Sequence, residues 1–337
     1  MKKRALSLLF AAALTISTLG GSTLVRAAED DPYTDLGIEL TSTDVTIVVA
    51  EQTYYIAPII AHFGWYDKFF SENNIKVDSV NFDNGPEIIE AMTADAVDWG
   101  PMGTQPAVSG AANGANISAV ASFVDQSKSA VLATLSDDIN TVEDLKGKKI
   151  GAKVGSSEYA FLLWALQGVG LSVDDVEVIN LDIATVATAL ENGEVDAAVA
   201  NINRFIRVEV DDGVEFKYVT NAVGSGTALQ IIAVRNEFAE AHPDIISALL
   251  QFYVWAEDFI ANNHDEAIEI ISDYFGLEPD IPETTLTYQT YAFTPLQEFY
   301  DTTDSYLDFM YDNEYITDRI PTEDFVQLQY AEAIGLP

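Results

Sequence analysis

Four short segments carry residue types that could bind a ligand, and each follows an apolar run of the sequence. They are Glu51–Tyr55, Pro101–Gln105, Gly155–Ser157 and Asn201–Arg204. Ligands of open α/β sheets bind beyond the carboxyl ends of the strands, so segments in this position could line one site. Gly155–Ser157 also precedes an expected helix, where glycine permits close approach and free N–H groups attract anionic oxygens. The same residues are common in ordinary helix caps.

Residues for catalysis, metal binding or ATP hydrolysis are not apparent. The three histidines, His62, His242 and His264, do not lie at a metal-binding spacing. The sequence contains neither a G-x-S-x-G nucleophile motif nor a P-loop. Neighbouring acids are expected throughout a chain with 54 Asp and Glu residues, and they indicate a solvated surface. We therefore expect no catalytic residue, no metal and no cofactor.

The composition excludes several other classes of protein. Lys and Arg number 16, which gives a net charge of −38 and makes binding to nucleic acid or anionic lipid unfavourable. Cysteine is absent, which excludes disulfides, thiolate metal sites and a lipid-modified cysteine anchor. The excess of acid is consistent either with a saline habitat or with a solubilising surface.

The first 27 residues have the layout of a secretory signal peptide. A basic start at Lys2–Arg4 precedes an apolar stretch from Ala5 to Leu19, and Val25–Ala27 forms a cleavage site before Ala28. A membrane anchor is the alternative, but this stretch is shorter than the roughly 20 residues that span a bilayer. We expect export to a periplasm or to the extracellular and cell-wall space. Residues 28–43 are acidic and polar and are expected to form a mobile leader.

The remaining chain alternates between expected strands and helices. This pattern predicts an α/β fold with βαβ units, mostly parallel sheets and a helical region after Pro243. The segments Glu90–Trp99 and Thr188–Ala197 resemble each other, and each contains Val-Asp before an apolar strand. Two similar α/β lobes would produce this repeat, although chance similarity between βαβ units would also explain it.

Several segments resemble the nitrate/sulfonate/taurine family of ABC-transporter substrate-binding proteins. They are Ala57–Tyr66, Ile75–Val77, Ala94–Gly100, Val142–Gly151, Gly155–Ser157 and Leu190–Ala197. The Asp-Leu-Lys-Gly-Lys-Lys element at 144–149 is the most specific of them, although related binding-protein families share it. The resemblance covers about Asp44 to Arg235, and the helical tail resembles the family only in kind.

The resemblance implies a two-lobed fold of the type II periplasmic-binding-protein kind, with the ligand held between lobes that close by a hinge motion. The crossovers would lie near Ala130–Ser136 and Ala228–Arg235. Lobe 1 would then comprise residues 44–133 and 233–337, and lobe 2 residues 134–232. The implied partners are a membrane permease and a separate ATPase subunit, and we expect a monomer.

One departure from the family pattern leaves the identity of the ligand open. Many relatives carry Trp-x-Pro where this chain has Asn201–Arg204. Arg204 could pair with a sulfonate or carboxylate, or form a surface ion pair. Tyr54, Tyr55 and Phe123 could cover a ring or an alkyl chain, although Phe123 also suits a core. Glu51 could attract the amine of a zwitterion or a heteroaromatic base. The candidate ligand-binding residues are Gln52, Thr53, Tyr54, Tyr55, Gly103, Thr104, Gln105, Phe123, Gly155, Ser156, Ser157, Asn201 and Arg204.

These observations favour a binding protein of an ABC importer that captures a sulfonate, taurine, nitrate or a pyrimidine-type solute. An enzyme of the pyrimidine-precursor class, which shares the fold, is one alternative. The expected signal peptide and the lack of cysteine or clustered histidines count against that enzyme. A ligand-sensing surface protein that reuses the fold is the other alternative.

Overall fold

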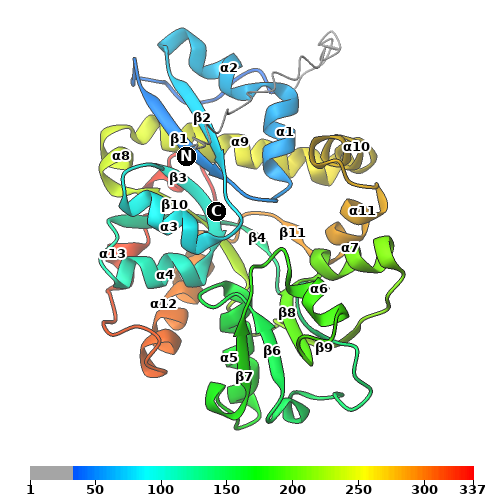
Figure 1. Cartoon of the computed structure of the whole chain (residues 1–337). Coiled ribbons are helices and arrows are strands. Elements are labelled where there is room, and N and C mark those ends of the chain that lie inside the picture. Colours follow the sequence, from blue (N-terminus) through cyan, green and yellow to red (C-terminus); the bar gives the residue numbers. More distant parts are fainter. Residues whose placement is uncertain (1–32) are drawn as a thin grey trace, which may run out of the picture. The chain divides into compact units, whose positions relative to one another are not determined.

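The computed structural model describes residues 33–337. The chain divides into two units, Met1–Asp35 and Leu36–Pro337, and every helix and strand described lies in the second unit (Figure 1). The predicted signal peptide and the start of the predicted leader lie outside the described residues. Near the end of that leader, the N–H groups of Thr41 and Ser42 donate to Asp244 Oδ2 at 2.6 and 2.7 Å. Thr41 and Ser42 belong to the second unit and are therefore bonded to Asp244 of the same unit.

A six-stranded sheet forms the framework of what we call the first lobe. Its strand order is β11-β4-β10-β3-β1-β2. β1 pairs parallel with β2 and β3, whereas β10 pairs antiparallel with β3 and β4, and β11 antiparallel with β4. The bounds are β1 Thr46–Glu51, β2 Lys76–Asn81, β3 Trp99–Gly103, β4 Ile117–Asp125, β10 Leu229–Arg235 and β11 Thr290–Tyr291.

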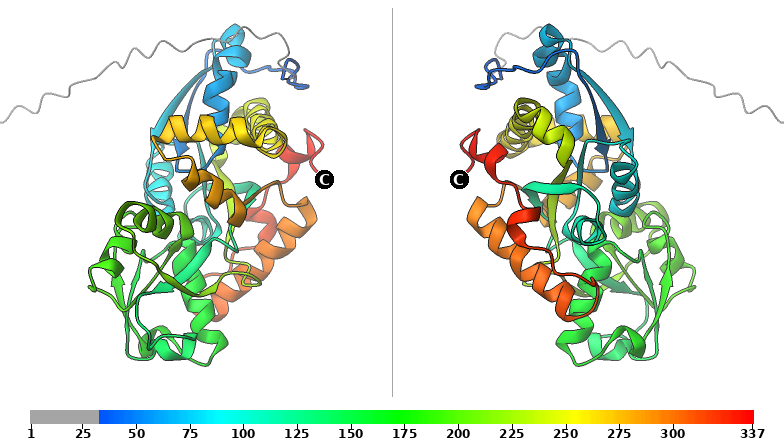
Figure 2. Two further views of the ribbon diagram at one scale, coloured as in Figure 1. Left: turned by 90° about the vertical axis from the view of Figure 1, so that its right-hand side faces the viewer. Right: turned by 90° about the vertical axis from the view of Figure 1, so that its left-hand side faces the viewer.

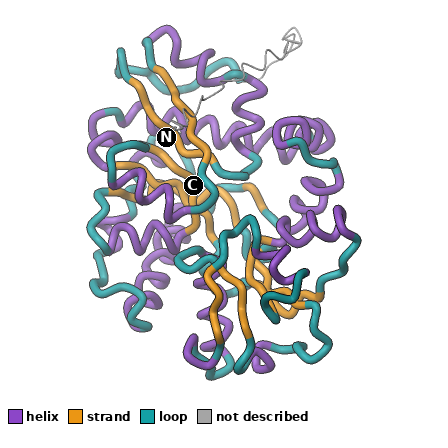
Figure 3. Tube along the Cα trace, viewed as in Figure 1, coloured by secondary structure: helices purple, strands orange, loops and turns teal. Residues whose placement is uncertain are grey.

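A five-stranded sheet forms the framework of the second lobe, in the order β7-β6-β8-β5-β9. β6 pairs parallel with β7 and β8, and β5 pairs antiparallel with β8 and β9. The bounds are β5 Ala130–Thr134, β6 Lys149–Ala152, β7 Glu177–Asn180, β8 Ala197–Asn201 and β9 Lys217–Asn221. Figure 3 shows these strands grouped apart from those of the first sheet.

Both sheets are mixed, which corrects the prediction of mostly parallel sheets. The reason is the same in both lobes, because β5 and β10 are the first strands after the chain changes sheet and run against their neighbours. Five strands of each sheet then follow one order, β2-β1-β3-β10-β4 in the first and β7-β6-β8-β5-β9 in the second. The predicted α/β class, with two lobes and a helical C-terminal region, is confirmed.

The chain crosses between the sheets at residues 126–129 and 222–228. The predicted boundaries place Ala130–Ala133 in lobe 1 and Leu229–Ile232 in lobe 2, whereas strand pairing puts them in the second and first sheets respectively. Apolar strands flank both crossings, so the hydrophobic pattern does not mark where the sheet changes. We use "second lobe" for residues 130–221 and "first lobe" for the other elements.

One strand of the first lobe is displaced from its expected position. The pattern predicts Ala96–Gly100, whereas β3 runs from Trp99 to Gly103. Proline usually ends a strand, but Pro101 lies inside β3. β1 pairs with β3 only at Val49 and Trp99, so Pro101 lies beyond the ladder on that side.

The helices of the first lobe come from both ends of the chain. Their bounds are α1 Ile56–Phe63, α2 Trp65–Phe70, the 3-10 helix η1 Ser71–Asn73, α3 Gly85–Thr93, α4 Thr104–Ala112, α8 Asn236–Ala241, α9 Pro243–Asn262, α10 His264–Phe275, α11 Asp280–Tyr288, α12 Leu296–Asp312, α13 Thr322–Phe325 and α14 Gln329–Glu332. Met92 of α3, Val108 of α4 and Leu307 of α12 share a core with Ala119 and Ile231 of the sheet. Among the described residues, no helix combines the length and apolar character needed to cross a membrane.

Helices cover both faces of the second sheet. Their bounds are the 3-10 helix η2 Val142–Leu145, α5 Ser157–Gly168, the 3-10 helix η3 Val173–Asp175, α6 Val186–Glu191 and α7 Ile202–Asp212. Phe161 of α5 shares a core with Leu132, while Phe205 of α7 shares another with Val131. Adjacent strand residues point to opposite faces, so α5 lies on one side of the sheet and α7 on the other. Figure 2 shows α12 (orange) beside the second lobe (green).

The repeated Val-Asp segments occupy equivalent positions in the two sheets. Val48 N–H of β1 donates to Asp98 Oδ2 at 2.9 Å, and Lys149 N–H of β6 donates to Asp196 Oδ2 at 2.8 Å. In return, Asp98 N–H donates to Val48 O and Asp196 N–H to Lys149 O, both at 2.8 Å. The sequence repeat therefore corresponds to two lobes of the same construction.

Candidate functional site

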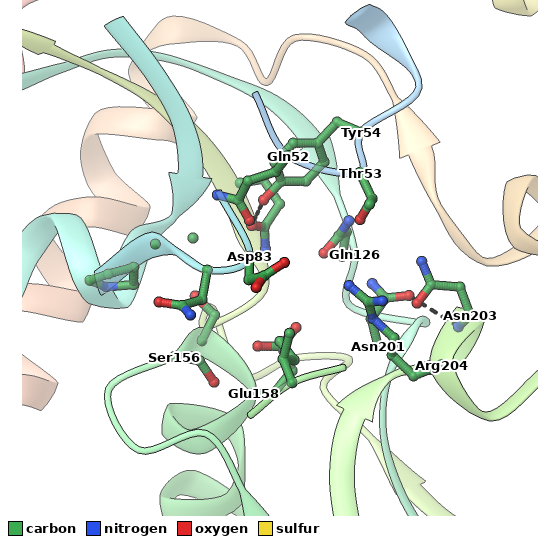
Figure 4. Close-up of a pocket in the computed structure, with 17 residues that line it drawn as sticks. Gln52, Thr53, Tyr54, Asp83, Gln126, Ser156, Glu158, Asn201, Asn203 and Arg204 are labelled. Carbon is green, nitrogen blue, oxygen red and sulfur yellow. Dashed lines mark hydrogen bonds between the residues drawn. The ribbon is translucent and has the colours of Figure 1, made fainter. Parts of the chain in front are cut away.

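A small polar cavity lies between the two lobes (Figure 4). The space open to the centre of a water molecule is about 60 Å³. The first lobe and the first crossover contribute Gln52, Thr53, Tyr54, Asp83, Asn84, Gly85, Gly103, Pro106, Gln126 and Gln230. The second lobe contributes Ser156, Ser157, Glu158, Ile183, Asn201, Asn203 and Arg204.

Four helices begin at this cavity, two from each lobe. The residues at their N-caps are Asn84 for α3, Gly103 for α4, Ser156 for α5 and Asn201 for α7, and all four line the cavity. Each helix begins directly after a strand or strand-end turn, which is the position expected for ligand-binding segments in α/β sheets. The first N–H groups of a helix lack intrahelical acceptors and carry a partial positive charge. The cavity is therefore suited to anionic groups.

The wall from the first lobe is held rigidly by side-chain hydrogen bonds. Gln52 Nε2 donates to Pro101 O at 2.9 Å, and Tyr54 Oη donates to Gln230 Oε1 at 2.6 Å. The ring of Tyr54 also meets Phe123 edge to face, with centroids 5.0 Å apart. Burial raises the pKa of Tyr54 well above its usual value, so the phenol stays protonated and donates to Gln230.

The wall from the second lobe presents two buried polar atoms that have no hydrogen-bond partner in the described part of the chain. They are Ser157 Oγ and Asn203 Oδ1. The neighbouring Ser156 Oγ, in contrast, accepts from Tyr159 N–H at 3.2 Å and caps α5. Buried polar atoms normally have partners, so these two atoms indicate a place where a bound molecule completes the hydrogen bonding.

One cation and two carboxylates surround the cavity. Among the described residues, no carboxylate lies within ion-pair distance of Arg204, although Glu158 and Asp83 are close enough to influence it. Burial lowers the pKa of Arg204 and these two carboxylates oppose that shift, so the guanidinium remains charged. Burial raises the pKa of Glu158, opposed by its own N–H group, Ser156 and Arg204. Figure 4 shows Asp83, Glu158 and Arg204 around the same space.

The lobes touch at one side of the cavity. A Cβ atom added at Gly103 would overlap Ser157 Oγ and lie 3.0 Å from Ser157 Cβ. Gly103 belongs to β3 and Ser157 begins α5, so the absence of a side chain at residue 103 allows this approach. The structure thus has the two lobes in contact around the cavity.

The structure brings most of the candidate residues to the cavity, but not all of them. Those that line it are Gln52, Thr53, Tyr54, Gly103, Ser156, Ser157, Asn201 and Arg204. Phe123 is fully buried behind Tyr54, and Tyr55 is buried with its N–H bonded to Tyr291 Oη. Thr104 Oγ1 donates to Leu229 O inside the first lobe. Gln105 is buried in α4, and Gly155 lies in the turn before the α5 cap. None of these five lines the cavity.

Several cavity residues are not among the sequence candidates. Asn84 and Gly85 lie at the start of α3, shortly after β2, so the rule used for the other four segments applies to them as well. Gln126 follows β4 in the same way. Gln230 lies inside β10, where nothing in the sequence distinguishes it from a core position. Glu51 is not a cavity residue, and its Oε2 accepts from Tyr274 Oη at 3.1 Å.

Two α/β lobes joined by two crossovers, with a cavity between them, define the class of periplasmic-binding-protein-like folds. The chain belongs to the NMT1/THI5-like family, whose sequence model matches residues 41–267. The alkanesulfonate-binding protein SsuA of Xanthomonas axonopodis pv. citri, solved with bound MOPS, has a similar structure. Its TM-score is 0.76 at 23% identity, covering 84% of this chain and 98% of that one.

Relatives with assigned names are mostly binding proteins. A putative aliphatic sulfonates-binding protein of Bacillus subtilis is 30% identical, over 66% of this chain and 67% of its own. The taurine-binding periplasmic protein of Escherichia coli is 28% identical, over 65% and 68%. A putative thiamine biosynthesis protein of Haemophilus influenzae is 25% identical, over 66% and 70%. The resemblance to sulfonate- and taurine-binding proteins is therefore confirmed.

Proposed function

We propose that this protein is the extracytoplasmic solute-binding component of an ABC importer and holds a small organosulfonate in the cavity between its lobes. The observation that carries the proposal is the meeting of four helix N-termini and one guanidinium, which has no ion-pair partner within residues 33–337, at a single cavity. Both kinds of group bind anionic oxygens. The sulfonate- and taurine-binding relatives support this choice of anion over a carboxylate or nitrate.

The hydrogen-bonding atoms suit a sulfonate in particular. Its three oxygens are acceptors, and Arg204 offers up to five N–H donors in a fixed plane. Ser157, the first residue of α5, offers a further donor, because its Oγ has no acceptor among residues 33–337. We therefore assign the sulfonate oxygens to Arg204, Ser157 and the first N–H groups of α5.

The carboxylates limit which sulfonate binds well. Asp83 and Glu158 add negative charge beside the single cation, which disfavours a ligand with two negative groups. An ammonium group near these carboxylates would be stabilised, so a small zwitterion such as an aminoalkanesulfonate fits this set of charges. The small volume of the cavity also favours a short ligand.

The proposed transport cycle uses the two crossovers. Residues 126–129 and 222–228 are the only covalent links between the lobes in the described chain, so they would act as the hinge for opening and closing. The ligand would enter the open form and pass from the closed form to a membrane permease, with ATP hydrolysed by a separate subunit. Export of the protein rests on the signal-peptide pattern of residues 1–27 and on the periplasmic relatives.

A ligand screen tests the proposal. Taurine, ethanesulfonate, nitrate, acetate and an aminopyrimidine are added to the purified protein, and the melting temperature is measured. A ligand at 100 times its dissociation constant stabilises the folded state by about 2.7 kcal/mol. We expect taurine and ethanesulfonate to raise the melting temperature and calorimetry to give one site. A response to the aminopyrimidine alone would contradict the proposal.

The thiamine biosynthesis relative favours a second candidate, an enzyme acting on a pyrimidine precursor. This candidate predicts turnover of the aminopyrimidine, measured by loss of its ultraviolet absorption or by mass spectrometry. The binding-protein proposal predicts an unchanged pyrimidine after prolonged incubation.

A further inference from the structure

A chain of buried hydrogen bonds runs from the Gln52–Tyr55 loop to the second lobe. Tyr55 N–H donates to Tyr291 Oη at 3.0 Å, and Tyr291 Oη donates to Gln289 Oε1 at 3.2 Å. Gln289 Nε2 then donates to Asn201 Oδ1 at 3.1 Å. Gln289 precedes β11 of the first lobe and Asn201 ends β8 of the second, so the last bond joins the lobes outside the crossovers.

The series of hydrogen bonds continues from Asn201 to the first crossover. Asn201 Nδ2 donates to Ser129 Oγ at 3.1 Å, and Ser129 Oγ donates to Gln126 O at 3.0 Å. Ser129 and Gln126 lie in the crossover 126–129, and Gln126 lines the cavity. The side chains that take part in this series of hydrogen bonds are all buried. An amide or hydroxyl left unpaired there would therefore be costly.

The direction of each bond fixes the orientation of both amides. Gln289 accepts from Tyr291 through its oxygen and donates to Asn201 through its nitrogen. Asn201 accepts through its oxygen and donates to Ser129 through its nitrogen. Rotating Asn201 by 180° would place its Nδ2 against the N–H of Asn203, and rotating Gln289 would place its Oε1 against Asn201 Oδ1, whereas the hydroxyls of Tyr291 and Ser129 can donate or accept. The Asn203 N–H therefore sets the orientation of Asn201, and Asn201 sets that of Gln289.

The orientation of Asn201 matters for the cavity. Its Oδ1 also accepts from Asn203 N–H at 3.3 Å and so caps α7. Asn203 and Arg204 lie in the first turn of that helix and line the cavity. At the other end of the series of hydrogen bonds, Tyr55 directly follows the cavity residues Thr53 and Tyr54. Gln289 itself does not line the cavity.

We propose that Gln289 is a positioning residue for ligand binding, which sets the start of α7 and Arg204 against the Gln52–Tyr55 loop. It acts through Asn201 on one side and Tyr291 on the other. The effect on affinity rests on the proposed function of the cavity, whereas the effect on the two cavity walls does not. A residue that only filled space would affect stability alone.

Gln289→Met tests the proposal because it retains the length of the side chain and removes the amide. We expect binding of taurine and ethanesulfonate, measured by calorimetry, to weaken about tenfold, the effect of roughly one or two lost hydrogen bonds. Asn201→Ala combined with Gln289→Met should lose less affinity than the sum of the two single losses, because part of the effect of Gln289 passes through Asn201. Fully additive losses, or an unchanged affinity in Gln289→Met, would overturn the proposal.

Gln167→Met is the matched control. Gln167 Nε2 donates to Asn313 Oδ1 at 2.9 Å and also joins the lobes, but it is exposed and does not line the cavity. The same substitution there should change the affinity less than twofold. An equal loss in both variants would show a general effect of lobe contact and would overturn the specific role of Gln289.

Amide hydrogen exchange provides a readout that needs no ligand. In Gln289→Met, the N–H groups of Tyr55 and Asn203 should exchange about tenfold faster than in the unsubstituted protein. Tyr291→Phe, a milder change, should accelerate exchange at Tyr55 and leave Asn203 unchanged. Unaltered exchange at both sites in Gln289→Met would overturn the proposal. If neither sulfonate binds the unsubstituted protein, the proposed function fails and the exchange result alone decides the role of Gln289.

Discussion

The first and second lobes arrange five strands in the same order, and each uses an aspartate, Asp98 or Asp196, to anchor the strand that has two parallel neighbours, β1 or β6. Their contributions to the cavity differ. The first lobe supplies amides, a tyrosine held by Gln230, and the carboxylate of Asp83. The second supplies Arg204, Glu158 and the unpaired Ser157 hydroxyl. The comparison indicates that strand order is set by the fold, whereas the chemistry of each wall is set by residues just beyond the strands.

The two aspartates also differ in their surroundings. Asp98 is buried and accepts from Arg235 Nη2 at 2.6 Å, whereas Asp196 is exposed and among the described residues has no ion pair. The shared backbone bond is therefore strengthened by a buried ion pair in the first lobe only. This difference predicts unequal effects of the same substitution.

The largest effect is expected for Asp98→Ala. It leaves the mostly buried Arg235 guanidinium with only the exposed carboxylates of Asp95 and Glu237, at 3.6 and 3.3 Å, and breaking a buried pair costs up to about 3–5 kcal/mol of the free energy of unfolding. Asp196→Ala removes the equivalent backbone bond at an exposed site and should cost about 1 kcal/mol. Urea denaturation measures both. Equal losses would show that the two lobes use this aspartate in the same way.

Arg204→Met should have the next largest effect, and on binding rather than stability. Loss of charge-assisted hydrogen bonds to the sulfonate is expected to weaken binding about 100-fold, as measured by calorimetry. Arg207→Met is the control, because Arg207 lies on the same helix, is exposed and pairs with Asp211 at 3.7 Å. That variant should bind within about twofold of the unsubstituted protein. Similar losses for both would reduce the role of Arg204 to general electrostatic attraction.

Gly103→Ala should have a smaller effect at the contact between the lobes. The added methyl group would overlap Ser157 Oγ, so closure around the ligand should be hindered and binding weakened about tenfold. Adding Ser157→Gly creates room at this point and should recover part of the loss, apart from the contribution of the hydroxyl. If the double variant binds more weakly than either single one, the overlap is not the cause.

Much of the fold could be predicted because local patterns specify it. Leu229–Arg235 is rich in apolar and β-branched residues, which predicts a strand, and β10 has these bounds. The mixed direction of the sheets could not be predicted, because the hydrophobic pattern of β5 or β10 is the same in either direction. Which sheet each strand joins depends on contacts between residues that are far apart in the sequence. For the same reason, the crossovers lie at 126–129 and 222–228 and not at their predicted positions.

The candidate site was predictable where it lies directly beyond a strand. Thr53, Ser156 and Arg204 follow this rule and line the cavity. Tyr55 and Phe123 are aromatic residues that also lie near strand ends, but their side chains are buried in the interior of the first lobe. Gln230 and Gln289 became visible only when the partners of their amides were known. Sequence spacing does not contain that information.

The position of β10 between β3 and β4 has a consequence for biogenesis. During synthesis, the ribosome completes β3 and β4 early, but the strand that joins them is made only after the whole of 130–221. The continuous second lobe can therefore fold first, while β3 still has one unpaired edge and β4 lacks both of its neighbours, β10 and β11. Such edges are prone to association with other chains, so protection by a chaperone would be most valuable during this interval.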